Sequence, residues 1–165
     1  MAGAPGSGKS TWIHNHLSYF SGTTKIVSRD AIRFSILEEN DDYFSKENEV
    51  WKIFINDIKK GLKEYDNTIV DATHLNSRSR GKLLCALGSI LKDVEVNIIF
   101  IDTCLAKCLE QNEMREGRSR VPRSVIRRMF YGIEMPTLDE GFNNIYIYTK
   151  VGNKITYAAM EKEVN

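Results

Sequence analysis

A glycine-rich segment at the start of the chain, residues 3–10, constrains this sequence more than any other feature. It reads GAPGSGKS and satisfies the pattern G-x-x-x-x-G-K-[ST] in full. In such a loop, backbone N–H groups surround phosphates, Lys9 offers a cation to the β- and γ-phosphates, and Ser10 can ligate Mg²⁺ at a helix N-terminus. The segment therefore predicts a Walker A loop that binds ATP and Mg²⁺. The residues predicted to contact the nucleotide are Gly3, Ala4, Pro5, Gly6, Ser7, Gly8, Lys9, Ser10 and Thr11.

Helical and strand patterns alternate after this loop. Apolar residues at helical spacing, such as Val50, Phe54 and Ile58, predict helices. The expected helices cover about residues 9–20, 30–38, 46–65, 77–92, 105–115 and 123–134, and the expected strands cover 25–28, 68–71, 94–102 and 144–149. A hairpin turn at 151–154 leads to an edge strand near 155–158. The alternation predicts an α/β, P-loop kinase fold with a mostly parallel sheet flanked by helices, in a single domain across residues 1–165.

A buried strand is expected immediately before a loop of this type, yet only Met1 and Ala2 precede Gly3. Without that strand its neighbours would lack backbone partners. We therefore expect apolar residues ahead of Met1 to form it. The alternative is that residues 155–158 take its place.

Composition and charge narrow the class of protein. Apolar residues make up 42% of the chain and charged residues 27%, which are ordinary values for a soluble globular protein. The net charge is +1, so any nucleic-acid binding must come from a local basic patch. The 3 cysteines form no CxxC pair and indicate a reducing compartment. No apolar run approaches a membrane span, so no membrane contact is expected and a cytoplasmic location is predicted.

Two charged residues follow the strand expected at 25–28. Asp30 comes at the carboxyl end of that strand, the edge at which ligands bind in folds of this type. A carboxylate there can accept the proton of an attacking hydroxyl, and Arg33, one helical turn later, can hold an anionic group of the acceptor. The pattern predicts Asp30 as a general base and Arg33 as a substrate contact, although Asp30 alone also fits a helix N-cap.

A second carboxylate, Asp71, ends the next expected strand. Its place after Ile69 and Val70 is typical of a Walker B residue that steadies Mg²⁺ directly or through water. Thr73 and Arg80 follow in the adjoining loop and helix start and are predicted to contact substrate.

The stretch 115–128 is dense in arginine and is opposed by one acid, Glu116. Gly117 and Pro122 interrupt it, so it is predicted to be a mobile basic lid. Guanidinium groups pair bidentately with phosphate oxygens and keep their charge, so Arg118 is expected to act on the transferring phosphoryl group. The arginines of the stretch are Arg115, Arg118, Arg120, Arg123, Arg127 and Arg128, of which the last three fit a solvated face equally well.

Taken together, these motifs resemble the kinase domain of 5′-hydroxyl polynucleotide kinases, which repair RNA and DNA ends. The resemblance spans nearly the whole chain. It depends on the Walker A loop, Ser28-Arg29-Asp30 with Arg33, Val70-Asp71-Ala72-Thr73, the lid from Arg115 to Pro122, and Glu140-Gly141-Phe142 before Ile145-Tyr146-Ile147. At position 74 the family usually has asparagine, and this chain has His74.

The resemblance implies roles for these residues. Asp30 would be the general base for the polynucleotide 5′-hydroxyl, and Arg33 would contact the acceptor's phosphate. Lys9 and Arg118 would stabilise the transferring phosphoryl group, with help from Arg115 or Arg120. Nucleic-acid 5′-OH ends would be the substrate, and phosphatase and ligase partners in trans would complete the repair.

Other functions fit the same motifs. A small-molecule kinase, or a toxin-type kinase acting on a nucleotide sugar, would share the Walker A loop, a base near Asp30 and an arginine lid. A nucleotide-gated switch or binding module with little turnover is a further class, although a GTPase switch needs Asn-Lys-x-Asp for guanine and residues 153–156 end in Thr156. Tyr43, Phe44 and Trp51 are candidates for stacking on bases, but core packing is the favoured interpretation.

Overall fold

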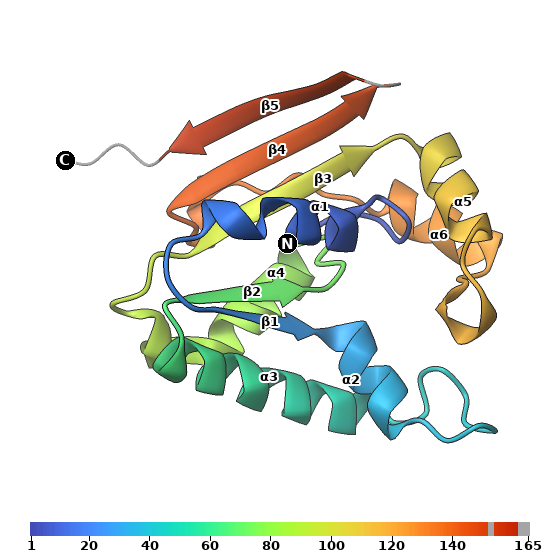
Figure 1. Cartoon of the computed structure of the whole chain (residues 1–165), viewed down its shortest axis with the longest axis horizontal. Helices are drawn as coiled ribbons and strands as arrows, with labels where there is room; N and C mark the ends of the chain where they lie inside the picture. The colour runs from blue at the N-terminus through green and yellow to red at the C-terminus, as the bar shows by residue number, and fades with distance from the viewer. Residues whose placement is uncertain (152–153, 162–165) are drawn as a thin grey trace. The chain divides into compact units, whose positions relative to one another are not determined.

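The structure is a computed structural model and describes residues 1–151 and 154–161. The chain forms two compact units (Figure 1). The first unit contains residues 1–11 and the chain from residue 73 onward, and the second contains residues 12–72.

The second unit is a two-stranded parallel sheet with helices. Strand β1 (Thr24–Ser28) pairs with β2 (Asn67–Asp71), which places Ser28 opposite Asp71. Helix α2 (Arg29–Ile36) begins directly after β1, and helix α3 (Glu47–Glu64) runs along the sheet (Figure 1). Each strand thus ends at the same edge, where α2 starts.

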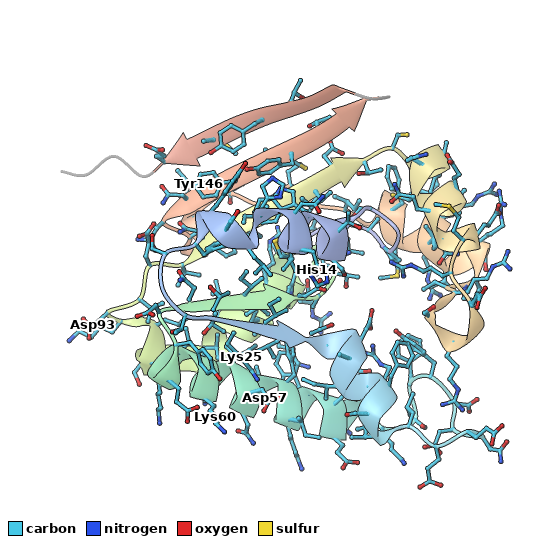
Figure 2. The ribbon with its side chains drawn as sticks, viewed as in Figure 1. His14, Lys25, Asp57, Lys60, Asp93 and Tyr146 are labelled. Atoms are coloured by element: carbon cyan, nitrogen blue, oxygen red, sulfur yellow. The ribbon has the colours of Figure 1, made fainter. Side chains whose placement is uncertain are left out.

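Helix α3 packs on this sheet through one apolar face. Val50, Phe54 and Ile58, spaced by four residues, are almost fully buried. Gly61 allows the closest approach, because a Cβ there would lie 2.8 Å from the Thr68 hydroxyl oxygen. Charged side chains such as Lys60 point away from the sheet (Figure 2).

The first unit contains the three-stranded sheet. Strand β3 (Asn97–Thr103) pairs in parallel with β4 (Asn144–Val151), and β4 pairs antiparallel with β5 (Lys154–Glu161). On the other side of β3, Ala2 forms a parallel bridge with Phe100. Its N–H donates to Ile99 O at 2.8 Å, and Ala2 O accepts from the Ile101 N–H at 2.9 Å. The residues just before the phosphate loop therefore continue this sheet in parallel.

The helices of the first unit come after β2 and on either side of β3. They are α4 (Ser77–Leu87), η2 (Gly88–Leu91), α5 (Leu105–Glu113), η3 (Gly117–Ser119), α6 (Arg123–Tyr131) and η4 (Leu138–Glu140). One core cluster joins Ala2, Ile98, Phe100, Phe142 and Ile145. A second joins Ala4 of the phosphate loop to Cys108, Leu109 and Ile126 of α5 and α6. The loop is thus part of the hydrophobic core.

The predicted α/β class and the element order are confirmed, and most differences lie at element ends. The helix predicted at 9–20 is α1 (Lys9–His16) followed by η1 (Leu17–Tyr19). The edge strand near 155–158 is part of the longer β5, which pairs with β4. It therefore does not replace the strand expected immediately before the phosphate loop. Of the predicted hairpin turn, residues 152–153 lie outside the described residues.

Two further features of the described chain bear on the predictions. Cys85, Cys104 and Cys108 are free thiols, and only Cys108 is buried. Within residues 1–151 and 154–161, no helix has both the length and the apolar character needed to cross a membrane.

Candidate phosphotransfer site

The backbone of the glycine-rich loop is held on two sides within the first unit. The Gly3 N–H donates to Thr73 O at 2.9 Å, so the loop is tied to the segment that follows β2. Gly3 and Gly6 both have positive φ. A Cβ at Gly3 would lie 2.7 Å from Ile101 O, and one at Gly6 would collide with the Cys108 carbonyl oxygen. Glycine at these positions lets the backbone pack directly on β3 and α5.

Side chains from the end of β3 and from α5 support the same loop. The buried Thr103 hydroxyl donates to Ser7 O at 2.9 Å, and the Cys108 thiol donates to Thr103 O at 3.4 Å. Burial raises the pKa of Cys108 to about 11, so the thiol stays protonated and remains a donor. The sequence does not predict Thr103 as a site residue, because its partner Ser7 is 96 residues away, nor Cys108, which supports the loop through Thr103.

Lys9 folds back onto the loop that it follows. Its ammonium donates to Gly3 O at 3.0 Å and to Ala4 O at 2.9 Å. These bonds keep a buried cation within the ring of the loop, which is the charge that a triphosphate requires. The loop therefore has the shape and the charge of a phosphate cradle.

The arginine segment, residues 115–128, is fastened at its base by Asn112. This side chain is 1% exposed. Its amide donates to Val121 O at 2.8 Å and accepts from the Val121 N–H at 2.9 Å. The intervening residues form a closed loop that carries η3.

The arginines of this segment differ in exposure and contacts. Arg123 pairs with Glu113, and Arg115 donates to Ser119 O at 3.4 Å. Arg118 and Arg120 are exposed, as are Arg127 and Arg128 on α6. The segment thus presents guanidinium groups to solvent from a fixed base, as a phosphate-binding lid requires.

The second unit contains a cluster around Asp30, in the first turn of α2. Asp30 Oδ1 accepts from Arg33 at 2.5 Å and from the Tyr43 hydroxyl at 2.9 Å. Arg33 also donates to Glu47 at 2.8 Å, and Glu47 pairs in turn with Arg29. We call these five residues the Asp30 cluster. The Asp30 side chain is 59% exposed, so a carboxylate held at one oxygen faces solvent.

Arg33 lies inside this cluster and is only 5% exposed. Its guanidinium lies 4.5 Å from the centroid of the Tyr43 ring. Burial disfavours its charge, but the hydrogen bond to Glu47 and the electrostatic interactions with Tyr43, Glu47 and Asp30 outweigh burial and raise the pKa of Arg33. These contacts favour a role in positioning Asp30 over the predicted contact with an acceptor phosphate.

Comparison with known proteins agrees with this geometry. A family model described as an AAA domain matches residues 1–136. The chain belongs to this AAA domain family. No curated protein matched the sequence.

Two solved structures resemble this AAA domain at low sequence identity. Kti12 from Chaetomium thermophilum, crystallised in complex with ADP-AlF3, is 18% identical, with a TM-score of 0.61 over 88% of this chain and 85% of that one. The tunicamycin resistance protein of Deinococcus radiodurans is 17% identical, with a TM-score of 0.52 over 79% of this chain and 76% of that one. Both likenesses show that the chain shares the α/β fold of these proteins.

The predicted magnesium ligands of this AAA domain belong to different units. Ser10 is the last residue of the glycine-rich segment and is exposed in the first turn of α1. Asp71 is half-buried at the last position of β2. A hydroxyl and a carboxylate are oxygen ligands of the kind that Mg²⁺ prefers, so each residue fits the predicted role.

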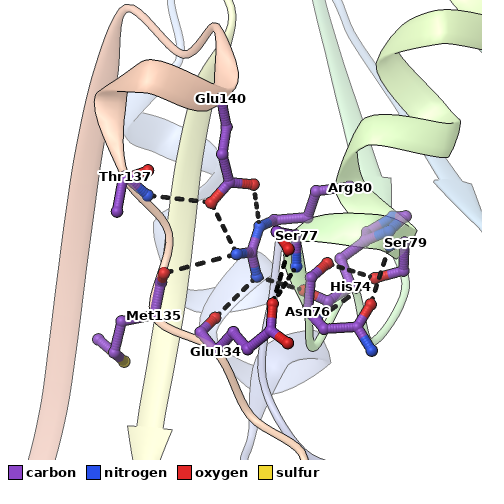
Figure 3. A network of polar contacts seen from close by, with 9 residues as sticks. All are labelled: His74, Asn76, Ser77, Ser79, Arg80, Glu134, Met135, Thr137 and Glu140. Atoms are coloured by element: carbon purple, nitrogen blue, oxygen red, sulfur yellow. Dashed lines mark hydrogen bonds and ion pairs between the residues drawn. The ribbon is translucent and has the colours of Figure 1, made fainter.

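Arg80 in this AAA domain is buried and lies within a network of polar contacts (Figure 3). It is 2% exposed and forms a bidentate pair with Glu140 at 2.6 and 2.7 Å. The same guanidinium donates to the carbonyls of His74, Glu134 and Met135. This arrangement argues against the substrate contact predicted for Arg80 and makes it a structural link between α4 and η4.

The neighbouring segment also has structural roles. Thr73 offers its carbonyl to Gly3, and no contact of its side chain supports or opposes the predicted substrate role. His74 has φ +42°, a left-handed conformation that asparagine adopts more readily than most residues.

Proposed function

We propose that this protein is an ATP-dependent phosphotransferase with a hydroxyl acceptor, and that the acceptor is the 5′-OH end of a polynucleotide. The observation that carries the proposal is the exposed Asp30 carboxylate, fixed at Oδ1 by Arg33 and Tyr43. The chain also contains a complete phosphate cradle closed by Lys9. A base for a hydroxyl and a cradle for a triphosphate are the two components that phosphoryl transfer requires.

The proposed reaction assigns a task to each group. The acceptor hydroxyl attacks the γ-phosphorus, its proton passes to Asp30, and the bond between the γ-phosphorus and the bridging oxygen breaks to release ADP. Lys9 and Arg118 offset the charge of the transferring group. Oδ2 of Asp30 is the oxygen assigned to the proton, because Oδ1 already accepts two hydrogen bonds.

The arginine segment supports a polynucleotide acceptor. It contains six arginines and one acid, and Arg118, Arg120, Arg127 and Arg128 are all exposed. One triphosphate does not need so many cations, whereas a polynucleotide backbone offers a phosphate at every nucleotide. The resemblance to 5′-hydroxyl polynucleotide kinases leads to the same acceptor.

One observation favours a second candidate, a small-molecule or nucleotide-sugar kinase. Within the Asp30 cluster, Arg29 and Arg33 are balanced by Asp30 and Glu47. The chain that follows α2 adds acidic residues at Glu38, Glu39, Asp41 and Asp42. A site with balanced or negative charge suits an uncharged acceptor better than a polyanion.

A phosphate-transfer screen distinguishes the two candidates. The protein is incubated with γ-labelled ATP, Mg²⁺ and matched amounts of 5′-OH RNA, 5′-OH DNA, nucleosides, sugars and nucleotide sugars. The same oligonucleotides with a 5′-phosphate serve as blocked controls. We expect label on the 5′-OH oligonucleotides alone. Preferential labelling of an uncharged metabolite would replace the proposal with the second candidate.

A further inference from the structure

An exposed aromatic ring adjoins the Asp30 cluster. Phe44 is 65% exposed although it is a large apolar side chain. Its ring centroid lies 4.7 Å from that of Tyr43, the residue that donates to Asp30, and 5.7 Å from the Arg33 guanidinium. Phe34 packs edge-on to Tyr43 from α2. The core packing favoured from the sequence is therefore wrong for Phe44.

The segment that carries Phe44 is held in place by its own polar contacts. Lys46 donates to Ile36 O at the end of α2 at 2.9 Å and pairs with Asp41 at 2.8 Å. Asp41 also accepts from the Glu38 N–H at 2.9 Å. These bonds tie both ends of the segment 37–46 together, so Phe44 is presented from a preformed turn.

Charge does not explain how the acceptor would be recognised beside Asp30. Arg33 is buried and already paired with two carboxylates, and the segment 38–42 is acidic. An acceptor phosphate thus has little to bind on this face, whereas a planar ring has Phe44. Stacking of a base on an aromatic side chain needs no charge and accepts any of the bases.

We propose that Phe44 is a base-stacking subsite for the 5′-terminal nucleoside of the acceptor. The inference rests on the proposed function and adds how the acceptor end is recognised: by the face of its terminal base rather than by its phosphate. Selection of the acceptor end is then independent of which base it carries, but it requires that a base be present.

The test uses two 5′-OH oligonucleotides that differ only in their first residue, which is either a normal nucleotide or an abasic one. Wild-type protein should have the lower KM for the normal acceptor. Phe44→Ala should raise that KM roughly 5- to 100-fold, the range that one lost base stack supplies. It should leave the KM for the abasic acceptor and both kcat values nearly unchanged.

Two further variants separate stacking from structure. Phe44→Tyr keeps an aromatic face and should restore the wild-type KM. Tyr19→Ala removes another ring of the same unit, 77% exposed, and should have no effect. The Phe44→Ala penalty should be the same at low and high salt, because stacking is not screened. Thermal melting confirms that each variant is folded.

The possible outcomes are distinct. An unchanged KM in Phe44→Ala, or an equal rise for the normal and abasic acceptors, overturns the subsite while the kinase assignment stands. If the wild-type protein labels no 5′-OH oligonucleotide, the proposed function fails and the subsite fails with it.

Discussion

The Tyr43 hydroxyl donates a hydrogen bond to Asp30 Oδ1 across 13 residues of sequence, with 2.9 Å between the two oxygens. The same hydroxyl accepts from Arg33 at 3.0 Å. Tyr43 thus joins a buried cation to an exposed carboxylate. Burial and the Asp30 carboxylate raise the pKa of Tyr43 to about 12, so the hydroxyl keeps its proton in any ordinary assay buffer.

Tyr43→Phe removes the hydrogen bonds to Asp30 and from Arg33 and little else, because the ring and its packing remain. We expect kcat to fall about tenfold, which corresponds to roughly 1.4 kcal/mol of lost hydrogen bonding to the base. The KM for ATP should stay constant. Steady-state kinetics from pH 7 to 10 should also show no loss of wild-type activity from ionisation of Tyr43. An unchanged kcat in the variant would show that Tyr43 does not position Asp30.

Features that depend on local pattern were predictable from the sequence. The spacing of Val50, Phe54 and Ile58 identifies the buried face of α3, because a helix brings residues four apart onto one side. The apolar Ile69 and Val70 predict a strand that ends at Asp71, and β2 ends there. The spacing of glycine, lysine and serine in the phosphate loop is one that few structures other than a Walker A loop require.

Features that depend on distant partners could not be predicted in this way. Arg80 has the sequence context of an exposed residue in the first turn of a helix, yet its carboxylate partner, Glu140, is 60 residues away. The sequence predicts that Arg33 is open to substrate, because nothing nearby in the sequence reveals its pairing with Glu47. Periodicity reports which face of an element is buried and leaves open which polar groups meet there.

Lys9→Ala should abolish transfer while the protein stays folded, because the lysine's main task is to offset phosphate charge. Some loss of stability is expected from the two carbonyls that Lys9 now satisfies. Ser10→Ala is the matched variant, since it removes the predicted magnesium ligand from an exposed position. Turnover close to wild type in either variant, with folding checked by circular dichroism, would contradict the phosphate-loop assignment.

The Arg80–Glu140 pair should make the first unit sensitive to acid. Burial alone would raise the pKa of Glu140, but the bonds from Arg80 and from the Thr137 N–H outweigh it and lower that pKa. A carboxylate with a depressed folded pKa adds stability above its unfolded pKa, and this stability is lost as the pH falls through the folded value. Urea unfolding from pH 7 down to pH 3 should show this loss, and Glu140→Gln should reduce its pH dependence.

Substitution of Arg80 in the same pair distinguishes a structural role for this residue from a role in substrate binding. Arg80→Ala leaves Glu140 without its ion-pair partner and removes the hydrogen bonds to three carbonyls, and breaking a buried pair typically costs about 3–5 kcal/mol. We expect a large drop in the free energy of unfolding with little change in the KM of the folded fraction. A raised acceptor KM without loss of stability would restore the role predicted from the sequence.

Arg118 should act on the transition state rather than on either substrate. If its guanidinium offsets charge on the transferring phosphoryl group, Arg118→Ala should lower kcat by roughly 10³ or more, the lower range for arginine fingers. The loss should be equal for every acceptor. Arg128→Ala, which removes an exposed arginine from α6, is the control and should change kcat little. A rise in KM with kcat intact would instead assign Arg118 to substrate binding.

Substitution of Asp30 and substitution of Arg33 should both lower kcat, because Arg33 donates a hydrogen bond that holds the Asp30 carboxylate in place. Asp30→Asn keeps the shape and should retain ATP binding but lose roughly 10²–10⁴ in rate, the usual contribution of a general base. Arg33 is paired with Asp30 and Glu47 inside the cluster. Its replacement should therefore lower kcat for every acceptor, whether or not that acceptor carries a phosphate next to its 5′-OH.

The variants of Arg33 are chosen so that misfolding does not imitate this result. Arg33→Lys keeps the charge but not the planar group that reaches Asp30 and Glu47 at once, and Glu47→Gln weakens the same support from the other side. Both should reduce kcat in the same direction as Arg33→Ala and by less, with acceptor KM nearly constant. If Arg33→Lys instead raises the KM for a nucleoside 3′-phosphate and leaves the KM for a plain nucleoside unchanged, Arg33 contacts the acceptor phosphate. The cluster must then open when the acceptor binds.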